Sequence, residues 1–588
     1  MSSVATAPLP DWDLDVYYPG LDSSEFAAQQ RRLVEQIAEF RTALTAAESG
    51  SASAGVLVNL LELQNDLYER FRLLEAYVYG KFSVNTRDPL ALAKTSEIER
   101  DTIPLRQLAV RFTAWVGSLP VDEYLASTPA LKPYAYRLHV AKVRATKLMS
   151  PAEESLAAEL RTTGASAWSR LHGNVTSQLD VTVNLPDGTK TMPMSAVRNL
   201  AHEADRAVRV AAFEAELAAW KQVETPLAAA MNSIKGEVNI LCRRRGWGTG
   251  LDEAVFDNNI DRETLDAMMA AAREAFPDFR RYFAAKARVH GLKQLSFCDI
   301  FAPVEGEGRT WEYDEACDFV ATQFDTFSAK MGDFARRNFA DNWVDVAPKA
   351  GKVDGAYCMT TIHGESRIMM NYSASFGSVK TLAHELGHGY HALCLGQQPM
   401  LLQETPSTLA ETASIFCETI VKNAALRNAT GQEKIALLDA CLQGPTQTIV
   451  DITSRFIFEN AVFDGRIDRE LTADELCGAM VSAQRETYGE LEAFHPYMWA
   501  VKPHYYSESS FYNFPYMFGL LFALGLYARF QAEPDSFRAQ YDDLLASTGQ
   551  ADAAELGRRF GFDTRSIEFW RSSLDVVRKD IDEFESLV

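Results

Sequence analysis

Residues 381–398, TLAHELGHGYHALCLGQQ, hold three of the chain's ten histidines within eight positions. Inside this stretch, His384, Glu385 and His388 form the pattern HExxH. On a helix, residues four apart lie on one face, so both imidazoles can reach one metal ion while the glutamate lies beside them. Leu382 and Leu386 supply an apolar side for such a helix. The stretch therefore predicts a helix that carries two ligands of a metal ion.

His391 follows the motif on the same predicted helix. In the longer pattern HExxHxxGxxH, a glycine would occupy this position, and a histidine would stand where this chain has Cys394. The third ligand is therefore expected elsewhere. We interpret His391 as a helix-face residue or as a hydrogen-bonding neighbour of the ligands.

A second helix is predicted over residues 405–422, TPSTLAETASIFCETIVK, where a carboxylate can complete the site. Glu411 and Glu418 lie seven residues apart and therefore share one face of this helix. Glu411 is the first choice as third ligand, and Glu418 is expected to accept a hydrogen bond from a histidine N–H. Spacing alone also allows Glu404 as the ligand.

Two histidines, a carboxylate and a neighbouring glutamate suit a hydrolytic zinc site. Imidazole nitrogens bind Zn²⁺ well, and a catalytic zinc keeps one position for a water, whose pKa it lowers to about 7. Glu385 is then placed to act as general base, taking a proton from the zinc-bound water as it attacks a carbonyl. We expect one zinc ion per chain.

A strip rich in histidine and tyrosine occurs near the C-terminus, over residues 495–519, HPYMWAVKPHYYSESSFYNFPYMFG. Hydrolysis at a carbonyl needs hydrogen-bond donors for the oxyanion that forms there. Any single tyrosine of such a strip more often packs in a core with its hydroxyl at the rim. His495 and His504 beside these tyrosines favour a donor site for the group as a whole.

The composition limits the partners of the chain. Its 588 residues are 47% apolar and 23% charged, and its formal charge of −22 argues against nucleic acid or an anionic membrane as the main partner. Residues 514–527 form the longest apolar stretch, which is too short to span a bilayer. Residues 1–20 lack the basic start and apolar core of a secretory signal, so a cytoplasmic location is expected. The sequence predicts no particular oligomeric state.

Helical periodicity dominates the chain. Residues 24–47 and 194–222 repeat apolar side chains at three-to-four spacing. Residues 178–194 break this pattern and predict a hairpin around a Pro-Asp-Gly turn. Residues 350–375, rich in glycine and in β-branched or aromatic side chains, predict two or three short strands directly before the metal-binding helix.

A change of composition near residue 200 suggests two regions. We predict an N-terminal helical lobe over residues 1–200, which includes the hairpin, and a catalytic region over residues 201–588. No linker rich in proline, glycine or serine marks this boundary.

Four segments together resemble one enzyme family: residues 11–19 (DWDLDVYYP), 381–388 (TLAHELGH), 410–418 (AETASIFCE) and 503–519 (PHYYSESSFYNFPYMFG). They look like the oligoendopeptidase F branch of the thimet-oligopeptidase-like zinc metallopeptidase family. The resemblance implies a mostly α fold, an elongated two-lobed helical body with a deep central channel and a small β-sheet lining the active-site cleft. It also implies zinc-dependent hydrolysis of internal bonds in short unfolded peptides, because a narrow channel excludes folded proteins.

The resemblance also assigns roles by position. The matched residues are the zinc ligands His384, His388 and Glu411, the general base Glu385, the carbonyl donors His504, Tyr512 and Tyr516, and the substrate-pairing edge strand Gly355, Ala356 and Tyr357. Tyr505, in the strip rich in histidine and tyrosine, is expected to bind substrate as well. Pro515 bends the chain between the two candidate tyrosines, so the choice between Tyr512 and Tyr516 stays open.

Two other functions remain as alternatives. A zinc carboxypeptidase on a similar helical scaffold would need a cation in the cleft to hold a free C-terminal carboxylate, for which Lys502 and Arg367 are candidates. A catalytically silent peptide-binding scaffold is the second alternative. Glu385 argues against it, because a structural zinc site has no use for a base.

Overall fold

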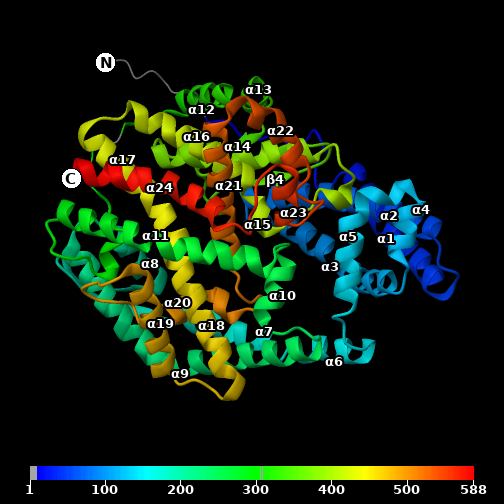
Figure 1. The fold of residues 1–588 in the computed structure, drawn as a ribbon, viewed down its shortest axis with the longest axis horizontal. Helices are drawn as coiled ribbons and strands as arrows, with labels where there is room; N and C mark the ends of the chain where they lie inside the picture. The colour runs from blue at the N-terminus through cyan, green and yellow to red at the C-terminus, as the bar shows by residue number, and fades with distance from the viewer. Residues whose placement is uncertain (1–8, 305, 307–308) are drawn as a thin grey trace. The chain divides into compact units, whose positions relative to one another are not determined.

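The computed structural model describes residues 9–304, 306 and 309–588, and most of them lie in helices (Figure 1). The mostly helical fold with small sheets that the sequence predicts is confirmed. The chain divides into two compact units. Unit 1 contains Met1–Leu148, Arg309–Ala424 and Arg529–Phe560, and unit 2 contains Met149–Gly308, Ala425–Ala528 and Gly561–Val588.

Unit 1 starts with three long helices that pack against one another: α1 (Ser24–Ser49), α2 (Ala54–Val84) and α3 (Pro89–Gly117). Side chains at the N-caps of all three accept hydrogen bonds from the backbone of the first turn. The apolar stripe predicted over residues 24–47, which includes Phe26 and Leu33, is buried. Burial of this stripe stabilises the helices more than their intrinsic propensity does.

Unit 1 contains further α-helices, among them the helix with the HExxH motif. They are α4 (Val121–Ser127), α5 (Ala135–Ala145), α12 (Tyr313–Phe327), α13 (Ala329–Ala340), α14 (Phe376–Leu395), α15 (Ser407–Ala410), α16 (Thr412–Asn428, in unit 1 as far as Ala424), α22 (Pro534–Ala546) and α23 (Ala553–Arg559).

Unit 1 also contains a three-stranded sheet in the order β3-β5-β4. The strands are β3 (Val344–Asp345), β4 (Tyr357–Thr360) and β5 (Ser366–Met369). β4 and β5 pair antiparallel, with Cys358 opposite Ile368, whereas β3 runs parallel to β5. β4 and β5 confirm the short strands predicted before the metal-binding helix. β4 is an edge strand among the described residues.

Unit 2 is helical apart from the predicted hairpin, which forms as β1 (Asp180–Leu185) and β2 (Gly188–Pro193). In it α9 (Arg206–Arg244), α18 (Ile452–Asp468) and α19 (Ala473–Tyr488) pack together (Figure 1). Its helices are α6 (Pro151–Arg161), α7 (Ala165–Ser177), α8 (Met194–Asn199), α9 (Arg206–Arg244), α10 (Gly250–Asp257), α11 (Arg262–Val289), α17 (Gly431–Pro445), α18 (Ile452–Asp468), α19 (Ala473–Tyr488), α20 (Met498–Val501), α21 (Phe514–Ala532, in unit 2 as far as Ala528) and α24 (Ile567–Leu587).

The long apolar stretch near the C-terminus forms most of α21, whose residues are largely buried. Over the described residues, no helix combines the length and apolar character needed to cross a membrane. The predicted boundary near residue 200 lies within unit 2, and the division of the chain there stays a prediction.

Candidate metal centre and catalytic site

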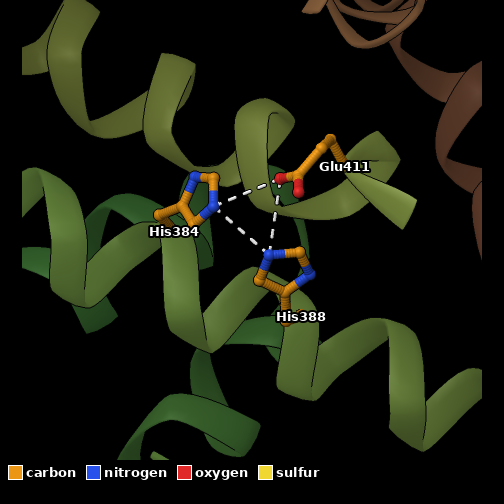
Figure 2. Close-up of side chains that lie close together, drawn as sticks. All are labelled: His384, His388 and Glu411. Carbon is orange, nitrogen blue, oxygen red and sulfur yellow. Dashed lines mark hydrogen bonds and ion pairs between the residues drawn. The ribbon is translucent and has the colours of Figure 1, made fainter. Parts of the chain in front are cut away.

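Helix α14 carries the HExxH motif. The helix starts after Ser375, whose side chain accepts a hydrogen bond from the backbone of Ser378. His384 and His388 lie one turn apart on it, and both rings point toward the carboxylate of Glu411 (Figure 2). The motif therefore forms the helix that its sequence predicts.

Glu411 does not lie inside a continuous helix. The single helix predicted over residues 405–422 is wrong at this point, because α15 ends at Ala410 and α16 begins at Thr412. The hydroxyl of Thr412 donates to the carbonyl of Leu409 over 2.6 Å, a local bond that competes with regular helical hydrogen bonding. Glu411 thus occupies a turn between two helices and projects from it toward α14.

The two imidazoles and the carboxylate form a compact triangle of donor atoms. Nε2 of His384 lies 3.2 Å from Nε2 of His388 and 3.2 Å from Oε2 of Glu411, and Nε2 of His388 lies 3.4 Å from the same oxygen. Three donors at about 2.0–2.1 Å from a tetrahedral ion would lie roughly 3.3 Å apart. The donor set and its spacing therefore fit one zinc ion.

Close backbone packing sets the distance between α14 and the turn that carries Glu411. A Cβ atom at Gly387 would lie 2.5 Å from Cα of Ser414 and 2.6 Å from the carbonyl oxygen of Ala413. A side chain here would push the start of α16 away from α14. Gly387 thus allows the approach that brings Glu411 to the histidines.

Two further side chains hold the ligands in place. Ser414 donates a hydrogen bond of 2.7 Å to Oε2 of Glu411. Glu418 places its Oε2 3.3 Å from Nδ1 of His384, and its other oxygen lies 2.9 Å from the ammonium of Lys380. Glu418 therefore lies where the sequence predicts a carboxylate that accepts from a ligand histidine.

The charges of the cluster are strongly coupled. Burial alone would lower the pKa of His384, but hydrogen bonds to Glu411 and Glu418 outweigh it and raise that pKa to about 10. Burial would raise the pKa of both glutamates, but the pKa of Glu411 is held far below its usual range by the two histidines. Lys380 and His384 lower the pKa of Glu418 to about 2. In the metal-free cluster the two glutamates are therefore ionised and His384 holds a proton, which a divalent cation would displace on binding.

Glu385 lies beside this triangle in a cavity of about 610 Å³. It is 6% exposed, and burial raises the pKa of its carboxyl. The backbone N–H of Cys358 on β4 donates a hydrogen bond to this carboxylate. The residues that line the cavity are Arg72, Glu75, Ala356, Tyr357, Cys358, Thr360, His384, Glu385, His388, His391, Ala392, Leu395, Gln403, Glu404, Thr405, Ala410 and Glu411.

His391 points its Nε2 away from the donor triangle. This atom lies 2.9 Å from the hydroxyl of Thr548 and 3.2 Å from the carbonyl of Leu545. Burial lowers the pKa of the imidazole to about 4. His391 is therefore a buried structural histidine of the ligand helix.

The outer edge of β4 faces the catalytic cavity. Residues of an antiparallel strand point their backbone groups alternately toward and away from the partner strand. Thr361 donates to Glu365 across the pair and Cys358 donates to Glu385, so Ala356, Cys358 and Thr360 face outward. Gly355 and Tyr357 face inward, and the carbonyl of Gly355 accepts from Asn371. Of the three predicted pairing residues, Ala356 alone turns its backbone outward.

The predicted carbonyl donors belong to unit 2. The rings of His504 and Tyr512 stack 4.8 Å apart at an interplanar angle of 11°, and the hydroxyls of Tyr512 and Tyr516 lie 2.9 Å from each other. Both tyrosines are more than 40% exposed. The structure thus brings these three residues together on the surface of the unit.

Tyr505 is fully buried in the core of unit 2, where its ring packs against Phe458. The short helical turn over Pro503–Tyr506 directs Tyr505 and Tyr506 inward. The prediction that Tyr505 contacts substrate is therefore wrong for its side chain in this arrangement.

The two cations named for a carboxypeptidase have other surroundings. The guanidinium of Arg367 lies over the rings of Tyr17 and Trp343, and its side chain is 3% exposed. Lys502 lines a separate cavity of unit 2, and burial lowers the pKa of its ammonium to about 8. Neither lines the cavity that contains Glu385.

Some residues of the site gave no sequence signal. Arg72 and Glu75 enter the cavity from α2, more than 300 residues before the HExxH motif, and Arg72 donates to Gln403 over 2.6 Å. Cys358 contributes through its backbone, which no side-chain pattern reveals. Ser414 was recognisable only as a polar residue on the face of the predicted ligand helix.

Comparisons with known proteins point to one family. The model of Peptidase family M3 matches residues 199–576, and that of Oligopeptidase F matches residues 120–180. Oligopeptidase PepF of Bacillus subtilis (strain 168) is 21% identical over 98% of this chain and 87% of its own length. Group B oligopeptidase PepB of Streptococcus agalactiae serotype III (strain NEM316) is 24% identical over 91% of both chains.

Solved structures show the same fold. A candidate peptidase from Chlamydophila abortus superposes with a TM-score of 0.86 at 20% identity and covers 98% of both chains. Oligoendopeptidase-F from Enterococcus faecium superposes with a TM-score of 0.70 at 18% identity, covering 96% of this chain and 98% of its own.

Proposed function

We propose that this chain, which belongs to peptidase family M3, is a zinc-dependent oligoendopeptidase that hydrolyses internal bonds of short unfolded peptides. One observation carries the proposal. Three donor atoms of His384, His388 and Glu411 lie 3.2–3.4 Å apart, and the carboxylate of Glu385 lies beside them in the same cavity. That arrangement combines a metal site with a base.

We assign the metal to His384, His388 and Glu411. Zinc bound there would lower the pKa of a coordinated water to about 7 and polarise the substrate carbonyl. Glu385 accepts the proton of the attacking water at its carboxylate and delivers it to the leaving nitrogen. The N–H of Cys358 fixes the orientation of that carboxylate.

Substrate is expected to pair with the outer edge of β4, adding a strand to the sheet. The outward backbone groups of Ala356 and Thr360, and the carbonyl of Cys358, are the partners that this edge offers. The hydroxyls of Tyr512 and Tyr516, with His504 beside them, are proposed as donors to the oxyanion.

Cleavage of an internally quenched peptide of about ten residues tests the proposal. The peptide is amidated at its C-terminus, and the proteins compared are the wild type, Glu385→Gln, and Glu123→Gln as an exposed carboxylate control on α4. We expect Glu385→Gln to lose roughly 10²–10⁴-fold in kcat while its zinc content, measured by elemental analysis, stays at one per chain. Glu123→Gln should match the wild type.

Metal removal completes the test. Activity should disappear on chelation and return with one equivalent of zinc. A zinc-loaded wild type that cleaves the peptide only when its C-terminus is free would instead indicate a carboxypeptidase. A zinc-loaded wild type that cleaves neither form would indicate a silent scaffold.

A further inference from the structure

A second cavity of unit 1 adjoins the one that contains Glu385. It has a volume of about 1170 Å³ and lies between α2, α3 and the end of β4. Arg72, Glu75 and Thr360 line both cavities. The second cavity, called here the α2–α3 groove, therefore borders the catalytic cavity at these three residues.

The α2–α3 groove exposes more apolar than polar surface, although the ionisable side chains of Glu99, Arg100 and Arg106 also line it. Its apolar and aromatic lining includes Phe71, Tyr79, Ile98, Ile103, Leu105 and Met359. Ile103 is 57% exposed and Tyr79 is 41% exposed, although both are large side chains. Exposed apolar side chains gathered in a groove mark a binding surface more often than scattered ones do. The catalytic cavity beside it is lined mainly by ionisable and polar groups, so the two differ in the chemistry they accept.

The edge of β4 leads from one cavity to the other. Ala356 and Cys358 line the catalytic cavity, Met359 lines the groove, and Thr360 lines both. A strand rises about 3.4 Å per residue, so the step from Cys358 to Thr360 covers roughly 7 Å. A peptide paired with this edge and cleaved beside Glu385 would thus reach the mouth of the groove about two residues from the scissile bond.

We propose that the α2–α3 groove binds the flank of the peptide substrate and selects a large apolar or aromatic side chain two or three residues from the scissile bond. The proposal rests on the proposed function, because it takes the catalytic cavity as the place of cleavage. The observations that carry it are the shared lining residues, the open edge of β4 and the exposed apolar side chains.

The first test scans one peptide with Phe or Asn at each of the three positions on either side of the scissile bond. The wild type should prefer Phe at the second or third position on one side by roughly tenfold in kcat/KM. Ile103→Glu should abolish that preference and leave the rates at the other positions unchanged. Val110→Glu is the matched control, because Val110 is 50% exposed on the same helix and does not line the groove.

A second variant fills the groove with a bulky side chain instead of placing a charge in it. Ser96 is an exposed residue that lines the groove about two helical turns from Ile103. Ser96→Trp should lower kcat/KM for the peptide with Phe at the selected position, mainly through a higher KM, and spare the Asn peptide. Ile103→Glu or Ser96→Trp behaving like Val110→Glu with every peptide would overturn the proposal.

A binding measurement separates this proposal from the proposed function. Fluorescence anisotropy of labelled Phe and Asn peptides with the Glu385→Gln protein needs no cleavage. A preference for Phe in Glu385→Gln that disappears in the Glu385→Gln, Ile103→Glu double variant supports the groove even if the wild type cleaves nothing. Equal binding of both peptides by these proteins overturns the groove even if the wild type is an active endopeptidase.

Discussion

The hydroxyl of Ser414 donates a hydrogen bond of 2.7 Å to Oε2 of Glu411, the same oxygen that faces both imidazoles. Ser414 is fully buried at the start of α16, so its hydroxyl has a fixed position. The bond orients the carboxylate toward the histidines before a metal arrives. Side chains that orient a ligand in this way commonly contribute ten- to hundredfold to metal affinity.

Ser414→Ala should therefore weaken zinc binding by roughly tenfold. Competition with a chelator of known affinity measures the change. At saturating zinc, kcat should stay close to that of the wild type, because no substrate contact is removed. Ser573→Ala is the control, since that buried serine donates to the carbonyl of Phe569 on its own helix. Equal zinc affinity in Ser414→Ala and Ser573→Ala would contradict a positioning role.

Glu418→Gln tests the second support of the ligands. The substitution keeps the shape of the side chain but removes the charge that faces Nδ1 of His384 and the ammonium of Lys380. We expect zinc affinity to fall by about ten- to hundredfold, because the imidazole of His384 becomes a less basic metal ligand. Lys380→Met should weaken zinc less, since it leaves the carboxylate in place. The reverse order of the two variants would show that Lys380, rather than Glu418, governs the site.

The sequence predicted what is encoded within single segments. Helix α14 follows from about twenty consecutive residues, in which the metal ligands and the apolar face share one period. The break before α16 was missed, because it depends on whether the hydroxyl of Thr412 bonds to Leu409, and periodicity does not report such local competition.

Contacts between distant segments were also beyond the sequence. The hydrogen bond from the N–H of Cys358 to Glu385 depends on the register of β4. The side chain of Tyr505 was misassigned because the short turn over Pro503–Tyr506 decides which aromatic residues face inward. The resemblance named Gly355, Ala356 and Tyr357, of which only Tyr357 belongs to β4, and the pairing pattern shows that Ala356 faces outward and Gly355 does not.

Gly387→Ala should destabilise the protein although alanine favours a helix by about 1 kcal/mol. The new methyl would overlap the backbone of Ser414 and Ala413, and such overpacking costs roughly 1–3 kcal/mol. Because α16 must shift, Glu411 should leave the triangle and zinc affinity should fall. Gly478→Ala on α19 is the matched control, since a Cβ there meets nothing within 4 Å. Thermal unfolding should show a loss for the first variant and a small gain for the second.

The buried imidazole of His391 should make the free energy of unfolding depend on pH. Burial lowers the pKa of its imidazole to about 4, with a further lowering by His388, against opposing effects of the carbonyls of Leu545 and Ala410 and of Glu411. Its unfolded value is about 6.5. A depressed pKa contributes stability that is present above pH 6.5 and is lost as the pH falls toward 4. The full contribution amounts to roughly 3 kcal/mol.

His391→Gln should therefore reduce the fall in the free energy of unfolding between pH 6.5 and pH 4. Urea unfolding of metal-free wild type and variant at several pH values measures this fall. His139→Gln is the control, because the side chain of that histidine is 50% exposed. A fall that is as large in His391→Gln as in the wild type would show that His391 does not titrate on unfolding.

Removing the hydroxyl of Tyr512 and removing that of Tyr516 should lower kcat by unequal factors. Each hydroxyl has one proton, and the two oxygens lie 2.9 Å apart, so one tyrosine donates to the other and the proton of the second can be directed to a different acceptor. Removing the hydroxyl that donates to substrate should cost about 10²–10³-fold in kcat, and removing the supporting hydroxyl should cost less. The larger effect therefore identifies the oxyanion donor.

The measurement compares kcat and zinc content for Tyr512→Phe, Tyr516→Phe and the double variant. Tyr497→Phe serves as control, since its hydroxyl donates to Glu224 over 2.7 Å in the same strip of sequence. Because the two hydroxyls act as a unit, the double variant should lose little more than the worse single one. Additive losses would indicate two independent donors, and unchanged kcat in all three would remove both tyrosines from the proposed site.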